Sequence, residues 1–193
     1  MIKAAFLDRD GVVNRNAPEG DYILRWEDVA ILPGAIEGIS QLRRAGFSVI
    51  VVTNQRCVSK DLITIRELEK LHQRLADTLA AAGAPIDAIY YCPHELGQAC
   101  ECRKPSPGML LEAARSRSIN LEGSWMIGDS DIDVEAGKRA GCKTARVVPE
   151  SGSKRATYVK ADLVSPSLLD AVSEILRLEK NPADPLAPKP AAR

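Results

Sequence analysis

Short apolar runs alternate along this chain with longer segments whose apolar residues recur at helical spacing. Residues 2–7 and 48–53 are largely apolar runs, as expected of strands that are buried on both faces of a parallel sheet. Strands that alternate with helices need right-handed crossover connections. The sequence therefore predicts an α/β fold, a doubly wound, Rossmann-like, mostly parallel sheet with helices on both faces. The predicted strands are residues 2–7, 48–53, 86–91, 124–127 and 143–148, with 161–164 as a sixth candidate.

The helical segments carry start and stop signals. Thr64 and Glu67 have the spacing of a capping box, and the helix that they open is expected to end at Gly83. Ser106 is a predicted N-cap, with Pro107 in the first helical position. The predicted helices are residues 35–45, 64–83, 106–118, 131–140 and 167–178.

The chain length suits one medium domain with a short tail. We expect a single domain over residues 1–180, followed by a Pro-rich tail at 181–193 that is predicted to be disordered. Residues 14–33 lack a clear period and are expected to form a flap or a short hairpin, so that the cap over the sheet is minimal. With no long flap or extra domain to provide an interface, we expect a monomer.

The composition excludes several classes of partner. The formal net charge is zero, which gives no global field for nucleic acid or an anionic membrane. No apolar run reaches the roughly 20 residues of a membrane span, and the N-terminus lacks the succession of a secretion signal. Three of the five cysteines fall within eleven residues, which favours a metal site in a reduced compartment over a disulfide framework. The expected location is the cytoplasm.

Polar residues stand where the predicted strands end. Asp8 and Asp10 follow the first strand, and residues i and i+2 of an extended chain point to the same side. Thr53 and Asp129 end two further strands. Ligands of open α/β sheets bind outside the carboxyl ends of the strands. Each residue taken alone also fits a solvated turn or a plain strand position, but together they favour one site.

A short loop gathers candidate metal ligands. Cys92 and His94, then Cys100 and Cys102, provide three thiolates and one imidazole. This Cys₃His set is that of a closed, four-coordinate structural zinc site, and the alternative is four unligated loop residues. Zinc would clamp a loop that is too short for a core of its own. Outside this loop, Cys57 and Cys142 are expected to be free thiols, and His72 is assigned no role.

Four motifs follow one another along the chain: Asp8-x-Asp10-Gly11-Val12, Thr53 after an apolar strand, Lys104 before a proline, and Gly128-Asp129-x-x-x-Asp133. Over residues 3–148 this set resembles the haloacid-dehalogenase-like phosphatases. Within that superfamily, two stretches are similar to the D-glycero-D-manno-heptose-1,7-bisphosphate phosphatases. They are Tyr90-Tyr91-Cys92-Pro93-His94 and Cys100-Glu101-Cys102-Arg103-Lys104-Pro105-Ser106-Pro107-Gly108-Met109.

The resemblance implies a Mg²⁺-dependent hydrolysis of a phosphate monoester. Asp8 would be the nucleophile that becomes an aspartyl phosphate, and Asp10 would be the general acid and then the general base. Thr53 and Lys104 would stabilise the phosphoryl group. Mg²⁺ would be held by Asp8, the backbone carbonyl of Asp10, and Asp129. The residues expected to bind the substrate are Asn54, Arg56, Lys60, Arg103 and Lys104.

Asp133 has two interpretations. Its spacing from Ser130 is that of a capping box, so support of the helix start is favoured over direct ligation of the metal.

The segment after Thr53-Asn54-Gln55 departs from the heptose family, which usually continues Ser-Gly with Arg-Gly a few residues later. Here the chain has Arg56-Cys57-Val58-Ser59-Lys60, and Lys60, a point charge, would replace the usual arginine. Two expectations differ from the preferred one, a cytoplasmic sugar-bisphosphate phosphatase. They are a histidinol-phosphate phosphatase, with Glu19 or Asp21 facing the substrate amine, and a catalytically idle scaffold that binds sugar phosphates.

Overall fold

Six parallel strands form one sheet in the order β3-β2-β1-β4-β5-β6, in a computed structural model that describes residues 2–149 and 158–180. The order reverses between β1 and β4, both of which are central and fully buried. The predicted doubly wound α/β fold is confirmed. The strands are β1 (Ala4–Leu7), β2 (Ser48–Asn54), β3 (Ala88–Cys92), β4 (Trp125–Gly128), β5 (Lys143–Val147) and β6 (Leu163–Ser165).

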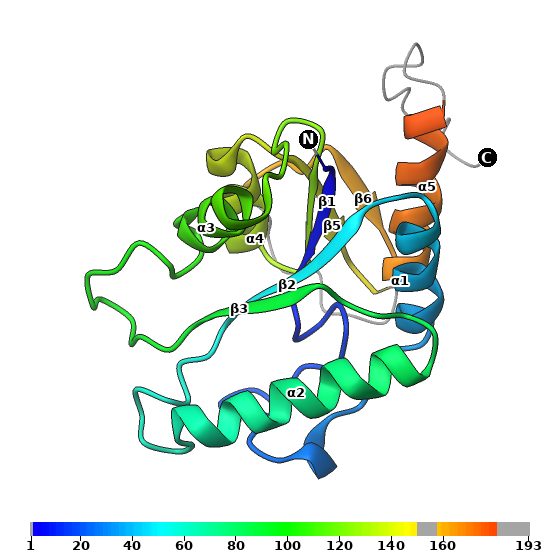
Figure 1. Ribbon diagram of the computed structural model, residues 1–193. Coiled ribbons are helices and arrows are strands. Elements are labelled where there is room, and N and C mark those ends of the chain that lie inside the picture. The colour runs from blue at the N-terminus through cyan, green and yellow to red at the C-terminus, as the bar shows by residue number, and fades with distance from the viewer. Residues whose placement is uncertain (1, 150–157, 181–193) are drawn as a thin grey trace, which may run out of the picture.

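Helices cover both faces of this sheet. In Figure 1, α1 and α5 lie together on one side of the sheet and α3 and α4 lie on the other. Each side has its own apolar core, one around Ile39 and Val172 and the other around Phe6 and Leu110. The helices are α1 (Ala35–Arg44), α2 (Ile65–Ala81), α3 (Gly108–Arg117), α4 (Asp131–Ala140) and α5 (Leu168–Lys180), with a 3₁₀ turn, η1 (Trp26–Asp28).

The longest helix, α2, begins as the sequence predicts. The Thr64 hydroxyl accepts a hydrogen bond from the Glu67 N–H, and the Glu67 carboxylate accepts one from the Thr64 N–H. Leu75 and Leu79 join the core on the α1 side of the sheet, whereas Leu68 packs near the flap in a smaller cluster. The start of α2 therefore lies beside the flap (Figure 1).

The flap at residues 14–33 is a loop rather than a hairpin, so the hairpin alternative is wrong. Its two legs meet at an antiparallel bridge between Asn14 and Ile31, and the Arg15 N–H donates to the Ala30 carbonyl at 2.8 Å. Beyond this contact the legs separate around the 3₁₀ turn η1. Polar and turn-forming residues in this stretch provide no alternating apolar face that would keep two strands paired.

Most predicted boundaries shift by one or two residues, and the third strand and α3 are two examples. The third strand begins at Ala88 rather than at residue 86. Helix α3 begins at Gly108 with Pro107 as its N-cap, so the prediction of Ser106 as N-cap is wrong. The reason is that a loop carbonyl takes the place of a capping side chain, because the Gly108 N–H donates to the Glu101 carbonyl at 3.0 Å.

The predicted tail at 181–193 lies outside the described residues, and one domain over 1–180 stays a prediction. Within the described part of the chain, no helix combines the length and the apolar character that a membrane crossing needs.

Candidate active site

Two aspartates stand at the point where the strand order reverses. Asp8 follows β1 directly, and its N–H donates to the Ile127 carbonyl of β4 at 2.9 Å, so it continues the ladder of the sheet. Asp129 follows β4. Asp8, Asp129 and Asp133 each have a carboxylate oxygen within 4.8 Å of those of the other two. The three acids therefore converge where ligands of doubly wound sheets bind.

Two glycines make this convergence possible. Gly11 has a φ of 87°, and a Cβ atom placed there would lie 2.2 Å from Asp129 Oδ2. A Cβ atom at Gly128 would lie 2.1 Å from the Cβ of Asp133. Any larger residue at these positions would push one of the two acids out of the cluster.

Lys104 is the cation inside the acid cluster. Its side chain is 1% exposed, and its Nζ lies 2.8 Å from Asp8 Oδ1 and 2.6 Å from Asp133 Oδ1. Nζ also donates to the Val52 carbonyl at 2.8 Å, so one hydrogen bond and two ion pairs hold the ammonium group. Burial opposes the charged form, but the carboxylates of Asp133 and Asp8 outweigh it and raise the pKa of Lys104 above its ordinary value.

The acids nevertheless exceed this one positive charge. Burial raises the pKa of Asp8 to about 8; Lys104 opposes the shift, and Asp133, Asp129 and Asp10 add to it. Burial and the nearby Asp133 also raise the pKa of Asp129. A cluster of carboxylates with more negative charge than one lysine can balance suits a hard divalent cation such as Mg²⁺. The residues present therefore fit the metal that the resemblance implies.

Asp133 both supports the helix and belongs to the acid cluster. Its Oδ2 accepts hydrogen bonds from the Ser130 N–H at 3.1 Å and from the Ser130 hydroxyl at the start of α4. Its Oδ1 faces Lys104. The side chain is fully buried. The contacts of Oδ2 fit the supporting role that the sequence favours, whereas the buried Oδ1 has an ion pair with Lys104 but no hydrogen bond.

Asp10 lies in a different environment from Asp8. The Arg9 guanidinium donates to its two oxygens, at 3.1 Å from Nε and 2.8 Å from Nη2. Asn14 Nδ2 donates to Oδ1 at 2.8 Å, and Gln55 Nε2 donates to Oδ2 at 3.1 Å. Four donors thus hold this carboxylate, which stays 24% exposed.

Thr53 and Asn54 place β2 against the site. Thr53 is buried, and its Oγ1 accepts a hydrogen bond from Gln55 Nε2 at 2.8 Å. The Asn54 amide pairs with the backbone of Lys104, and its role in substrate binding stays a prediction. Asn54 Nδ2 donates to the Lys104 carbonyl at 3.1 Å, and the Lys104 N–H donates to Asn54 Oδ1 at 3.0 Å. The Asn54 side chain therefore fixes the chain that carries Lys104.

The candidate zinc ligands meet in the loop after β3. His94 Nδ1 lies 3.5 Å from Cys92 Sγ and 3.2 Å from Cys102 Sγ, and the Cys92 and Cys100 sulfurs are 3.8 Å apart. Zinc with Zn–S bonds of about 2.3 Å has S···S edges of roughly 3.8 Å in a tetrahedron. The ligand atoms lie within 4.8 Å of one another. Both the type and the spacing of these donors fit a closed zinc site.

The three remaining predicted substrate residues lie around this loop and the flap. Arg103 Nη1 donates to the His94 carbonyl at 3.1 Å, so its side chain turns back onto the zinc loop. Arg56 donates to the Tyr22 hydroxyl at 3.0 Å from Nε and 2.8 Å from Nη2. Lys60 Nζ lies 5.5 Å from the centre of the Tyr22 ring. Arg56 and Lys60 are thus brought together by a flap residue.

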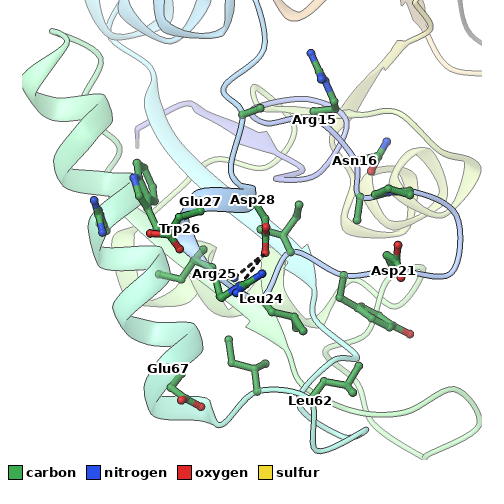
Figure 2. Close-up of a pocket in the computed structure, with 18 of the residues that line it drawn as sticks. Arg15, Asn16, Asp21, Leu24, Arg25, Trp26, Glu27, Asp28, Leu62 and Glu67 are labelled. Atoms are coloured by element: carbon green, nitrogen blue, oxygen red, sulfur yellow. Dashed lines mark hydrogen bonds and ion pairs between the residues drawn. The ribbon is translucent and has the colours of Figure 1, made fainter.

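An open pocket of about 1560 Å³ lies between the flap and the start of α2. Asn16 lines it and also donates to Asp129 Oδ2 at 2.9 Å, which joins the pocket to the acid cluster. Figure 2 shows charged flap side chains on one side of this pocket and Leu62 and Glu67 on the other. Tyr22 and Lys60 also line it. The acids of the cluster do not line the pocket themselves, and Asn16 is the lining residue that contacts one of them.

Several residues of the site were not predicted as such. His72 is only 5% exposed, and its Nε2 lies 3.0 Å from Arg9 Nη1, although the sequence analysis assigned it no role. Tyr22, Asn16 and Gln55 were also missed. Their partners are 34 to 113 residues away in the chain, so no local pattern indicates them. Cys57 and Cys142 are free and buried, as expected.

Comparison with known proteins decides the family. The HAD-hydrolase-like family model matches residues 101–171. A D-glycero-beta-D-manno-heptose-1,7-bisphosphate 7-phosphatase of Pseudomonas putida is 36% identical over 91% of this chain and 98% of its own length. The chain belongs to the heptose-1,7-bisphosphate phosphatase family of haloacid-dehalogenase-like hydrolases. A relative from Photorhabdus laumondii named for the alpha anomer is 37% identical over 72% of this chain and 79% of its own length.

The family also includes a solved structure with a similar fold. The D,D-heptose 1,7-bisphosphate phosphatase of B. bronchiseptica was crystallised with magnesium and phosphate. It has a TM-score of 0.81 and 31% identity, and the match covers 91% of this chain and 99% of that one.

Proposed function

We propose that this protein is a Mg²⁺-dependent phosphatase that removes one phosphate from D-glycero-D-manno-heptose 1,7-bisphosphate. The arrangement of Asp8, Lys104, Asp129 and Asp133 at the reversal point of the sheet is the observation that carries the proposal. The family relatives named for this substrate supply the substrate class. The names of the relatives include both anomers, so the preferred anomer is a matter for the assay.

Asp8 is the proposed nucleophile. Phosphate monoesters are among the slowest compounds to hydrolyse without a catalyst, and their negative charge repels a carboxylate. Lys104 lies 2.8 Å from Asp8 Oδ1 and supplies a buried positive charge beside the attacking group. Asp8 attacks phosphorus, the bond to the ester oxygen breaks, and an aspartyl phosphate forms. The Thr53 hydroxyl oxygen accepts a hydrogen bond from the Gln55 amide. The hydroxyl hydrogen of Thr53 therefore points away from that amide and is proposed to donate to a phosphoryl oxygen.

Asp10 is the proposed acid and base. It gives a proton to the leaving sugar oxygen and then takes a proton from the water that attacks the aspartyl phosphate. Its side chain is 24% exposed, so the carboxylate stays accessible for these proton transfers.

Mg²⁺ would be held by the carboxylates of Asp8 and Asp129 and by the backbone carbonyl of Asp10. When bound, it supplies positive charge that offsets the charge on the phosphoryl oxygens. The zinc of the Cys92, His94, Cys100 and Cys102 set would have a structural role, because four protein ligands leave no open position. It would fix the loop that ends in Arg103 and Lys104.

The second phosphate of the substrate is proposed to meet Arg56 and Lys60. Their side chains gather around Tyr22 at the edge of the pocket, in a region that the described structure connects to the acid cluster through Asn16. Arg103 is also proposed to meet this phosphate from the rim, where its Nη1 donates to the His94 carbonyl.

Histidinol phosphate and an idle scaffold are the outcomes that the assay must exclude. Released phosphate is measured with 4-nitrophenyl phosphate with and without Mg²⁺, and then with both heptose bisphosphate anomers and with histidinol phosphate. We expect Mg²⁺-dependent turnover and a preference for a heptose bisphosphate. Turnover that needs no divalent cation, or a preference for histidinol phosphate, would overturn the proposal. The cytoplasmic location and the monomeric state stay predictions, which fractionation and light scattering test.

A further inference from the structure

Arg9 stands between the two aspartates of the first motif and binds the carboxylate of the second. Its side chain is 1% exposed, which is rare for arginine. Nε and Nη2 both point at the Asp10 carboxylate, at 3.1 and 2.8 Å. A planar guanidinium that binds both oxygens of a carboxylate fixes the plane of that carboxylate as well as its position.

His72 of α2 holds the far side of the same guanidinium. Its Nε2 lies 3.0 Å from Arg9 Nη1, and the two rings of His72 and Tyr91 pack with centroids 5.5 Å apart. Arginine can only donate, so the histidine must accept at Nε2 and carry its hydrogen on Nδ1. Burial and the charge of Arg9 lower the pKa of His72 to about 3, against a small opposing effect of Asp10. The ring is therefore neutral and suited to accept.

These contacts form a chain from α2 to the acid. His72 orients Arg9, and Arg9 orients Asp10. Asn14 and Gln55 add one hydrogen bond to each Asp10 oxygen, but neither binds both oxygens at once. The role that the proposed mechanism gives Asp10 depends on where its proton lies relative to the leaving oxygen, and small misplacements in such geometry cost large factors in rate.

We propose that His72 and Arg9 are positioning residues, which hold the Asp10 carboxylate in the plane that proton transfer to the leaving oxygen requires. This inference rests on the proposed function and assigns a task to a buried histidine and arginine that the rest of the mechanism leaves unused. A merely structural role would lower activity on all substrates alike. A positioning role depends on how much the leaving group needs its proton.

The test compares two leaving groups. A sugar oxygen is a strongly basic leaving group and needs a proton, whereas 4-nitrophenolate leaves without one. The parameter is kcat/KM, which reports the steps up to the first irreversible one, here the transfer of the phosphoryl group to Asp8. The variants are His72→Leu, which removes the acceptor, and His72→Gln, which restores an amide oxygen in its place. Gln73→Leu, on the exposed face of the same helix, is the matched control.

We expect His72→Leu to lower kcat/KM for the heptose bisphosphate at least about tenfold more than for 4-nitrophenyl phosphate, since general acids contribute factors of about 10²–10⁴. His72→Gln should recover most of that difference, and Gln73→Leu should show none. The Asp10→Asn variant gives the upper limit, because it shows how much more kcat/KM falls for the heptose bisphosphate than for 4-nitrophenyl phosphate when the acid itself is lost. If His72→Leu does not fold, as judged by circular dichroism, Arg9→Lys takes its place. Lysine keeps the positive charge but cannot donate to both Asp10 oxygens from one planar group.

Equal losses on both substrates would overturn the inference, and so would full activity of the folded His72→Leu or Arg9→Lys variant. Failure of the proposed function gives a different result, because it would be seen in the unaltered protein: turnover would be absent, would not need Mg²⁺, or would favour histidinol phosphate over the heptose bisphosphate.

Discussion

The two aspartates of one short motif are served by two buried cations of different kinds. Asp8 faces Lys104, a point charge that is shared with Asp133 and comes from a loop about 100 residues away in the sequence. Asp10 faces Arg9, its own neighbour, whose fork binds both carboxylate oxygens. The Asp8 side is short of positive charge, whereas Asp10 is held by four hydrogen-bond donors.

This difference matches the two tasks. A carboxylate nucleophile that must also bind a metal cation benefits from negative charge that the neighbouring residues do not balance. An acid that must deliver a proton in one direction benefits from fixed orientation. Asp8 and Asp10 are the same residue type, so their different proposed roles, nucleophile and acid, follow from what each carboxylate contacts.

Replacing Asp8 tests the nucleophile side most severely. Asp8→Asn should lower kcat at least about 10⁴-fold, the scale observed when a covalent nucleophile is removed. The fold should persist, since the amide has the same shape and removes a charge whose burial is unfavourable. Phosphate release and thermal unfolding check the two statements. Substantial turnover by a pure sample would refute the covalent route.

Replacing Lys104 sharpens the contrast between the cations. Lys104→Met leaves Asp8 and Asp133 without their shared ammonium group, and breaking a buried pair in this way costs about 3–5 kcal/mol. Mg²⁺ should restore part of this stability, because it brings positive charge to the same acids. Urea unfolding with and without Mg²⁺ measures both effects. A variant as stable as the parent in the absence of Mg²⁺ would contradict the assigned charge balance.

Zinc removal should act through the Lys104 side. We expect the zinc-free protein, or Cys102→Ser, to show KM raised roughly tenfold with a smaller change in kcat, since a looser loop misplaces Arg103 and Lys104. Zinc content is measured with a colorimetric chelator, with one ion per chain expected. Cys142→Ala is the matched control, since that thiol is free and lies in another part of the fold. Unchanged kinetics in protein verified as zinc-free would count against the clamp.

The smallest effect is a pH dependence on the Arg9 side. The pKa of His72 falls from 6.5 to about 3 on folding, so the unfolded chain binds a proton between these pH values that the native protein does not. The free energy of unfolding therefore decreases as pH falls through 6.5. Its slope against pH corresponds to a difference of up to about one bound proton between the unfolded and native states.

His72→Gln should remove that component. The measurement is urea unfolding of both proteins from pH 5 to pH 8. Arg9, Asp10 and Tyr91 face the histidine and are present in both proteins, so the difference between the two proteins reports the histidine. Identical slopes would show that the histidine is not buried in its neutral form.

Local patterns made most of the fold predictable. The strand and helix alternation, the Thr64 and Glu67 cap and the polar strand ends are all encoded within a few residues, and the structure places Asp8 and Asp129 together as the strand-end rule indicates. Lys104 was identified only through its family motif, because nothing local shows that a loop lysine is buried.

The unpredicted part of the site depends on distant partners. His72 meets Arg9 across 63 residues, and Arg56 meets Tyr22 across 34. Amphipathic spacing describes which side of a helix faces the core, but it does not identify a single polar partner from another segment. The flap likewise takes its shape from contacts with α2 that its own sequence does not encode.

The two hydrogen bonds between the Asn54 side chain and the Lys104 backbone have a consequence for how such chains can diverge. They anchor the end of the zinc loop to β2, while Cys92 anchors its beginning at the end of β3, in register with Asn54. Insertions or deletions between His94 and Cys100 would then change the length of the loop there and leave the Lys104 ammonium group in place. Substrate preference can therefore drift by changes in loop length while the chemistry stays constant.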